Sequence, residues 1–281
     1  MGEMTPAVSA IRMDSVPYVE MPEDVIEVCD VYKSFIHPSG EIIEVLSGVN
    51  LSVQRQEFLS IIGPSGCGKS TIFNIIAGLL EPDSGKVMVH GEEINRTTGH
   101  VGYMMQRDLL LPWRSVLDNV SIGLEIQGMS KNERYEKARV YLERYGLLSF
   151  AHSYPTMLSG GMRQRLALIR TLVTNPDIIM LDEPFSALDY QTRLVLEEEI
   201  LTILKNENKT CVLITHDIEE AIALSDRVAV MTKRPTSVKR MYDIRLASRH
   251  GSVMKARSDH RFKEYFESIW RDLDIQIGGC H

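Results

Sequence analysis

The chain has 281 residues, of which 44% are hydrophobic and 25% charged, a composition that excludes a fibrous or a wholly disordered protein. It carries 31 Lys and Arg residues against 38 Asp and Glu residues, a formal net charge of −7. Because phosphate contacts need concentrated Lys and Arg, this acidic balance disfavours general nucleic-acid binding, and we expect no nucleic-acid partner.

Membrane and disulfide signals are both missing from the sequence. No stretch reaches the roughly 18 apolar residues of a membrane-spanning helix, and the N-terminus lacks the basic start and apolar run of a signal peptide. The four cysteines are far apart, with no metal-ligand spacing: Cys29, Cys67, Cys211 and Cys280. We therefore expect free thiols in a reducing cytoplasm.

Short β-rich runs alternate with helical patterns from Val25 onward. Two of the runs, 57–63 and 177–183, are nearly continuous apolar stretches, as expected of strands that are covered on both faces. The alternation predicts an α/β domain with a mainly parallel central sheet. The five runs span residues 26–32, 57–63, 86–91, 177–183 and 210–217.

The strand pattern disappears between about residues 107 and 173. Ser130 and Glu133 have the spacing of a helix capping box, and apolar residues then recur at helical spacing. Gly146 stands where the C-terminal cap of that helix is expected. The sequence therefore predicts a helical subdomain inserted into the α/β core.

The two ends of the chain differ from this core. The first residues carry several prolines with little periodicity, and near the other end residues 262–273 fit a short amphipathic helix. We therefore expect three parts: an N-terminal tail at 1–24, a main domain at 25–235 that contains the helical subdomain, and a short C-terminal extension with one helix at 236–281.

The string GPSGCGKS lies between a predicted strand and a predicted helix, and it fits the P-loop pattern. Its glycines let successive N–H groups point at phosphate oxygens, and the helix N-terminus adds a partial positive charge. Lys69 would neutralise the β- and γ-phosphates, and Ser70 would ligate Mg²⁺. The segment predicts a nucleoside triphosphate site formed by Gly63, Pro64, Ser65, Gly66, Cys67, Gly68, Lys69, Ser70 and Thr71.

The predicted apolar strand in the string DIIMLDE (177–183) ends in two acidic residues. Asp182 is placed to hold Mg²⁺ through water, and Glu183 is placed to polarise the attacking water. A GTPase is disfavoured, because the nearest match to the guanine-reading NKxD motif has Cys211 where the Asp should be.

The string LSGGMRQR predicts a second anion site at a helix start. Ser159 offers a hydroxyl, and Gly160 and Gly161 offer bare backbone N–H groups. Since the P-loop is already complete for one nucleotide, two anion sites in one chain suggest that each forms half of a shared site. Two subunits would then pair head to tail and clamp ATP between the P-loop of one and Ser159 of the other.

With these motifs in this order, the chain resembles the ATP-binding subunit of an ABC transporter, of the nitrate/sulfonate/taurine importer type. The resemblance covers about residues 25–235 and adds Gln106 in YMMQRD, the SALD string at 186–189 and His216 in THD. It implies a P-loop NTPase fold of ABC type, in which the mainly parallel sheet has an antiparallel β edge.

The resemblance also implies roles for these residues. Gln106 would touch the metal or the attacking water, His216 would hold the γ-phosphate and the water in line with Glu183, and Asp189 would lie along the subunit interface. Phe35 would stack on adenine, in preference to its neighbour Tyr32. The expected cofactors are ATP and Mg²⁺.

Pro112 and Trp113, in LLLPWRSV, are typical of the nitrate/sulfonate/taurine type. The segment fits either a surface that receives a permease helix or packing within the subdomain. The implied protein is a peripheral ATPase on the cytoplasmic face of the membrane that drives uptake of a small, anionic solute such as nitrate, a sulfonate, taurine or bicarbonate. Its implied partners are an integral-membrane permease, a second identical or homologous ATPase subunit and, indirectly, a periplasmic or extracellular solute-binding protein.

Other functions remain open at the level of sequence. An exporter ATPase has the same chemistry with different partners. A soluble ABC ATPase that acts on DNA or the ribosome usually needs a long coiled coil, a zinc hook or two tandem cassettes, and the sequence contains none of these. A P-loop kinase of small molecules has no use for the LSGGM string or the histidine.

Overall fold

The computed structural model describes residues 23–97, 99–186 and 188–273. Their central element is a six-stranded sheet with the order β10-β9-β3-β8-β7-β6. The pairs among β6, β7, β8, β3 and β9 are parallel, whereas β10 is antiparallel to β9. The strands span β3 Phe58–Ile62, β6 Val101–Met104, β7 Ile178–Asp182, β8 Thr210–Thr215, β9 Arg227–Met231 and β10 Val238–Asp243.

The apolar runs predicted as covered strands occupy the middle of this sheet. Every residue of β3 and β8 is buried, and so are the first four residues of β7. Helices cover one face of the sheet, and a helix together with the strands of a second sheet covers the other, so these strands have no polar side. The mainly parallel α/β core is therefore confirmed.

A second sheet of four antiparallel strands, in the order β2-β1-β4-β5, forms the expected antiparallel β part of the fold. It packs against the first sheet through a shared core that also includes helix α1 (Lys69–Ile76). The backbones of β1 and β4 approach closely at Gly85, where an added Cβ would lie 2.1 Å from the carbonyl oxygen of Asp30. The strands are β1 Asp24–Ile36, β2 Ile42–Gln54, β4 Ser84–Val89 and β5 Glu92–Glu93.

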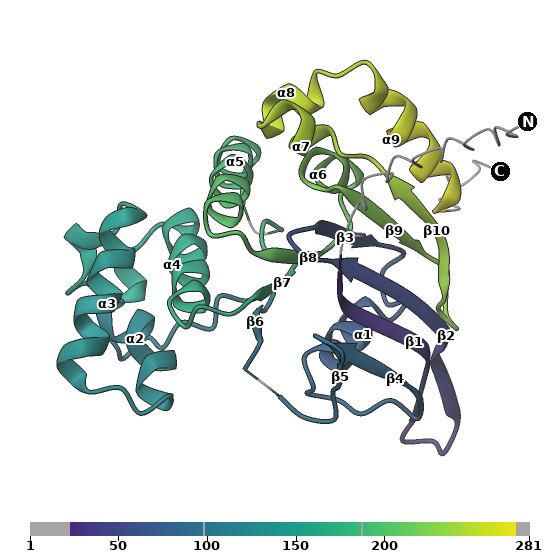
Figure 1. The fold of residues 1–281 in the computed structure, drawn as a ribbon, viewed down its shortest axis with the longest axis horizontal. Helices are drawn as coiled ribbons and strands as arrows, with labels where there is room; N and C mark the ends of the chain where they lie inside the picture. The colour runs from purple at the N-terminus through teal and green to yellow at the C-terminus, as the bar shows by residue number, and fades with distance from the viewer. Residues whose placement is uncertain (1–22, 98, 187, 274–281) are drawn as a thin grey trace, which may run out of the picture.

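The predicted helical subdomain is present and projects from one side of the core (Figure 1). It has its own apolar core, built mainly on α2 (Val116–Ile126), α3 (Lys131–Arg144) and α4 (Gly160–Leu172), with two short 3-10 turns at Leu148–Phe150 and Pro155–Met157. The capping box of Ser130 and Glu133 is formed in both directions, and Gly146 has a left-handed φ of 72° just past α3.

The expectation of one helix in the C-terminal extension is wrong. After β10 the described residues form α7 (Leu246–His250), α8 (Val253–Arg257) and α9 (Arg261–Asp272), which pack on α6 (Ile218–Leu224). Helices of five residues are too short to show a 3.6-residue period, so only α9 was visible in the sequence. The division into three parts stays a prediction, and most of the predicted tail, residues 1–22, lies outside the described residues.

The remaining helix of the core, α5 (Tyr190–Asn206), lies between the helical subdomain and the C-terminal helices (Figure 1). Cys29, Cys67 and Cys211 are free thiols, as expected, and Cys280 lies outside the described residues. Among the helices of the described ranges, none combines the length and the apolar character needed to cross a bilayer.

Candidate nucleotide site

The P-loop turns tightly between the end of β3 and the start of α1. Gly66 and Gly68 have φ angles of 71° and 125°, and a Cβ at Gly68 would lie 2.8 Å from a methyl group of Val45. Gly68 is the N-cap of α1 and offers no side-chain cap, so the first N–H groups of the helix face the loop. The Lys69 ammonium is buried and donates to the carbonyl oxygens of Gly63 (2.8 Å) and Pro64 (3.1 Å).

A pocket of about 540 Å³ opens over this loop and gathers residues from distant parts of the chain. Phe35 reaches it from β1, Gln106 from the loop after β6, and Glu183 from the end of β7. The neighbouring Tyr32 is not among the lining residues. The complete lining is Phe35, Ile43, Val45, Ser65, Gly66, Gly68, Lys69, Ser70, Thr71, Gln106, Glu183 and Arg234.

Three of the residues predicted for catalysis meet at the Glu183 carboxylate. The Gln106 amide nitrogen donates to Glu183 Oε2 at 2.9 Å, and His216 Nδ1 lies 3.3 Å from Glu183 Oε1. The parallel pairing of β7 with β8 brings them together, since Asp182 lies opposite Ile214 and the Glu183 N–H donates to the Ile214 carbonyl oxygen. Glu183 itself has a left-handed φ of 45°, which turns its side chain out of the strand direction.

Asp182, the last residue of β7, lies beside Ser70 and Lys69 of the P-loop. Burial raises the pKa of the Asp182 carboxyl, and hydrogen bonds from Tyr103 (3.3 Å) and Ser70, together with the charge of Lys69, act in the opposite direction. Tyr103 comes from β6, and its pKa is raised by burial and by the same carboxylate. These contacts keep a carboxylate and a hydroxyl oxygen side by side, the hard donors that Mg²⁺ prefers.

Two residues of this region were absent from the sequence predictions. Tyr103 stands in the same YMMQRD string as Gln106, but only the pairing of β6 with β7 turns it toward Asp182. Arg234 donates from its Nε to the Gly66 carbonyl oxygen at 3.2 Å, and 168 positions separate the two residues. No local motif marks either contact.

The predicted second anion site lies on a separate surface of the chain. Ser159 is the N-cap of α4 and accepts from the Met162 N–H at 3.3 Å. Ser159 and Gly161 line a pocket of about 300 Å³ that shares no lining residue with the P-loop pocket, and Gly160 is the first residue of α4 beside them. Asp189 caps α5 by accepting from the Thr192 N–H at 3.0 Å and lines neither pocket.

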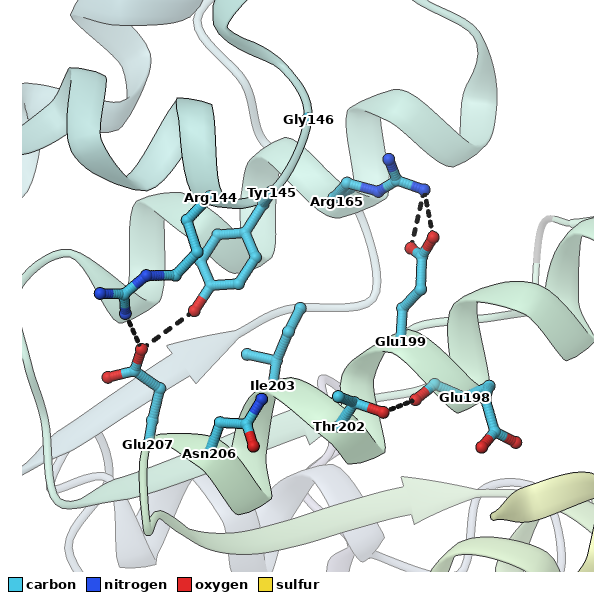
Figure 2. Close-up of a pocket in the computed structure, with 10 residues that line it drawn as sticks. All are labelled: Arg144, Tyr145, Gly146, Arg165, Glu198, Glu199, Thr202, Ile203, Asn206 and Glu207. Carbon is cyan, nitrogen blue, oxygen red and sulfur yellow. Dashed lines mark hydrogen bonds and ion pairs between the residues drawn. The ribbon is translucent and has the colours of Figure 1, made fainter. Parts of the chain in front are cut away.

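A larger cavity, of about 700 Å³, separates the helical subdomain from α5 and contains none of the predicted site residues (Figure 2). Ion pairs cross it: Arg165 pairs with Glu199 at 2.7 Å, and Arg144 and Tyr145 both contact Glu207. Arg165 Nε is buried and has no hydrogen-bond partner among the described residues, whereas its terminal nitrogen is held by Glu199. These contacts join the subdomain to α5.

The chain is similar to known proteins over most of its length. The family model described as ABC transporter matches residues 46–186. The chain is 45% identical to an uncharacterized ABC transporter ATP-binding protein of Methanocaldococcus jannaschii, over 85% of this chain and 88% of that protein. It is 38% identical to a nitrate import ATP-binding protein of Synechocystis, over 79% and 83%, and 41% identical to a taurine import ATP-binding protein of Rhizobium johnstonii, over 82% and 89%.

Solved structures have the same fold. A dimeric ATP-binding cassette bound to ADP and phosphate superimposes with a TM-score of 0.69 at 34% identity, over 78% of this chain and 99% of that one. Together with the family match and the relatives at 38–45% identity, this likeness establishes that the chain belongs to the ABC transporter family, as an ATP-binding subunit with ATPase activity.

Proposed function

We propose that this chain is the ATPase of an importer that takes up a small, anionic solute of the nitrate, sulfonate, taurine or bicarbonate type. The observation that carries the proposal is the similarity to a nitrate import and a taurine import ATP-binding protein over about four fifths of the chain. The proposal includes a second subunit that completes each ATP site. The P-loop and the LSGGM segment line two separate pockets, so sharing one ATP between them needs two chains.

In this proposal the P-loop N–H groups and Lys69 bind the phosphates of ATP, and Phe35 stacks on the adenine. Mg²⁺ fits the oxygen donors of Ser70 and Asp182, and Gln106 would be a further ligand; when bound, the ion would neutralise charge on the β- and γ-phosphates. Lys69 would exchange its present carbonyl partners for phosphate oxygens.

Glu183 is the proposed general base. Its carboxylate faces the P-loop pocket, and contacts from Gln106 and His216 fix its orientation from two sides. Glu183 would accept a proton from the attacking water while His216 steadies the γ-phosphate. Since Gln106 precedes the helical subdomain directly, its contact with Glu183 would couple the state of the γ-phosphate to that subdomain.

The segment after Gln106 is the proposed contact with the permease. Trp113 is 72% exposed and Leu109 is 52% exposed, so the apolar side chains of LLLPW do not all pack within the subdomain. Arg170 fixes the segment by donating to the carbonyl oxygens of Asp108 and Leu109. An exposed Trp on a fixed loop is typical of an interface anchor. The chain would thereby sit on the cytoplasmic face of the membrane, with the solute-binding protein contacted only through the permease.

Glu183→Gln tests the general base. The amide cannot take a proton, so ATP hydrolysis is expected to fall at least about 100-fold while ATP affinity is retained and an ATP-bound dimer accumulates. Lys69→Ala is the contrasting variant, because it is expected to weaken ATP binding itself. Turnover and nucleotide affinity of the purified variants separate the two, and normal turnover in Glu183→Gln would contradict the assignment.

Tyr103→Phe tests the hydrogen bond to Asp182. Loss of this donor raises the pKa of Asp182 further, so the carboxylate is protonated, and its metal lost, at a higher pH than in the unchanged protein. The acidic limb of Mg²⁺-dependent hydrolysis is therefore expected to move to higher pH. The variant keeps the ring that packs on Phe73, so an unchanged pH profile would show that the hydrogen bond does not act on the metal site.

Purification from detergent-solubilised membranes of the host tests the importer proposal. We expect a permease in a roughly equal amount, lost in Trp113→Ala and kept in the control Trp270→Ala, whose ring stacks on Phe266 far along the chain in α9. The operon and binding protein of that permease would distinguish an importer from an exporter. Recovery of ribosomes or DNA in place of a permease would contradict the proposal.

A further inference from the structure

Two histidines and an aspartate meet at the edge of the fold where the two sheets approach each other. His90 follows β4 of the antiparallel sheet, and its φ of 51° turns the chain sharply there. His100 directly precedes β6 and Asp177 directly precedes β7 of the parallel sheet. Pairing of β6 with β7 fixes the last two side by side, since the N–H of Asp177 donates to the carbonyl oxygen of His100.

The spacing of their side-chain atoms is close to that of a metal site. Asp177 Oδ2 lies 3.6 Å from His90 Nε2 and 3.7 Å from His100 Nδ1, and one ligand atom from each of the three residues lies within 4.8 Å of the other two. Ligands about 2.1 Å from a tetrahedral Zn²⁺ are about 3.4 Å from one another. The two distances from Asp177 Oδ2 to the histidine nitrogens are within a few tenths of an ångström of that value.

The imidazole of His90 supplies an independent observation. Its Nε2 is buried and has no hydrogen-bond partner among the described residues, although it points toward the Asp177 carboxylate. Buried polar nitrogens are nearly always satisfied, and an unsatisfied one calls for an explanation such as an unseen ion. A cation between His90 and Asp177 would satisfy the nitrogen and the carboxylate together.

We propose that His90, His100 and Asp177 bind a Zn²⁺-class transition-metal ion, with water as a fourth ligand. Imidazole nitrogens favour such ions over Mg²⁺ and Ca²⁺, whose preferred ligands are oxygens. Asp177 and His100 are half exposed, so the ion and its water would enter from the solvent side. Glu23, a further carboxylate that interacts electrostatically with His90, is paired with Arg55 at 2.8 Å.

This site is separate from the nucleotide site. It lies at the N-terminal ends of β6 and β7, whereas Gln106, Asp182 and Glu183 follow or complete the C-terminal ends of the same strands. At about 3.3 Å per residue, the strands hold the two sites some 15 Å apart. The ion would act as a clamp, because one ligand belongs to the antiparallel sheet and two belong to the parallel sheet.

Titration of the untagged, metal-free, nucleotide-free chain with Zn²⁺ or Co²⁺ tests the proposal. We expect one equivalent of tight binding, visible Co²⁺ absorption of a four-coordinate site, and a melting temperature several degrees higher with Zn²⁺. His90→Gln, His100→Ala and Asp177→Asn are each expected to weaken Zn²⁺ affinity at least about tenfold. None of the three is expected to change ADP affinity.

His152→Ala, an exposed histidine in the helical subdomain, is the matched control and is expected to bind as the unchanged chain does. All variants are made in a Cys280→Ser, His281→Ala background. This removes the adjacent thiol and imidazole at the end of the sequence, which could bind Zn²⁺ themselves. Retained ADP binding in each variant shows that the fold is intact. Absence of saturable binding in the unchanged chain, or Zn²⁺ affinity in all three ligand variants equal to that of the unchanged chain, would overturn the proposal.

Discussion

The constraint on which the rest of the structure depends is the parallel pairing of β3, β8, β7 and β6. Parallel strands end at a common edge, so residues that follow four strands far apart in sequence are brought to one place. The P-loop follows β3, Gln106 follows β6, Glu183 follows β7 and His216 follows β8. The contacts of Gln106 and His216 with the Glu183 carboxylate are a direct consequence of this register.

The helical subdomain carries the predicted second anion site on a surface separate from the P-loop pocket. It begins just after Gln106 and ends with α4, whose N-cap is Ser159. One inserted unit therefore connects the sheet edge that holds Gln106 and Glu183 to the pocket lined by the LSGGM segment, which is called the signature surface below. Ion pairs such as Arg165–Glu199 hold this unit to α5 along one side (Figure 2). A seam of partly exposed ion pairs costs less to open than an apolar core of the same size.

The sequence predicted those features that local physical chemistry determines. Continuous apolar runs marked β3 and β7, the spacing of Ser130 and Glu133 marked the start of α3, and the glycines of the P-loop marked the phosphate site. Features that depend on long-range pairing were missed. Tyr103 becomes a partner of Asp182 only through the register of β6 with β7, and Arg234 reaches Gly66 across 168 positions. The five-residue helices α7 and α8 were missed because they are shorter than the period that would reveal them.

The central claim is that each ATP site is completed by a second subunit, and mixing two inactive variants tests it most directly. Lys69→Ala disables the P-loop, and Gly160→Asp places a negative charge at the signature surface, where the nearest atom to an added Cβ is 3.6 Å away. In a mixed dimer, one site combines the intact P-loop of one chain with the intact signature of the other. The account predicts that an equal mixture regains roughly a quarter of normal ATP hydrolysis. A mixture no more active than its two components would contradict it.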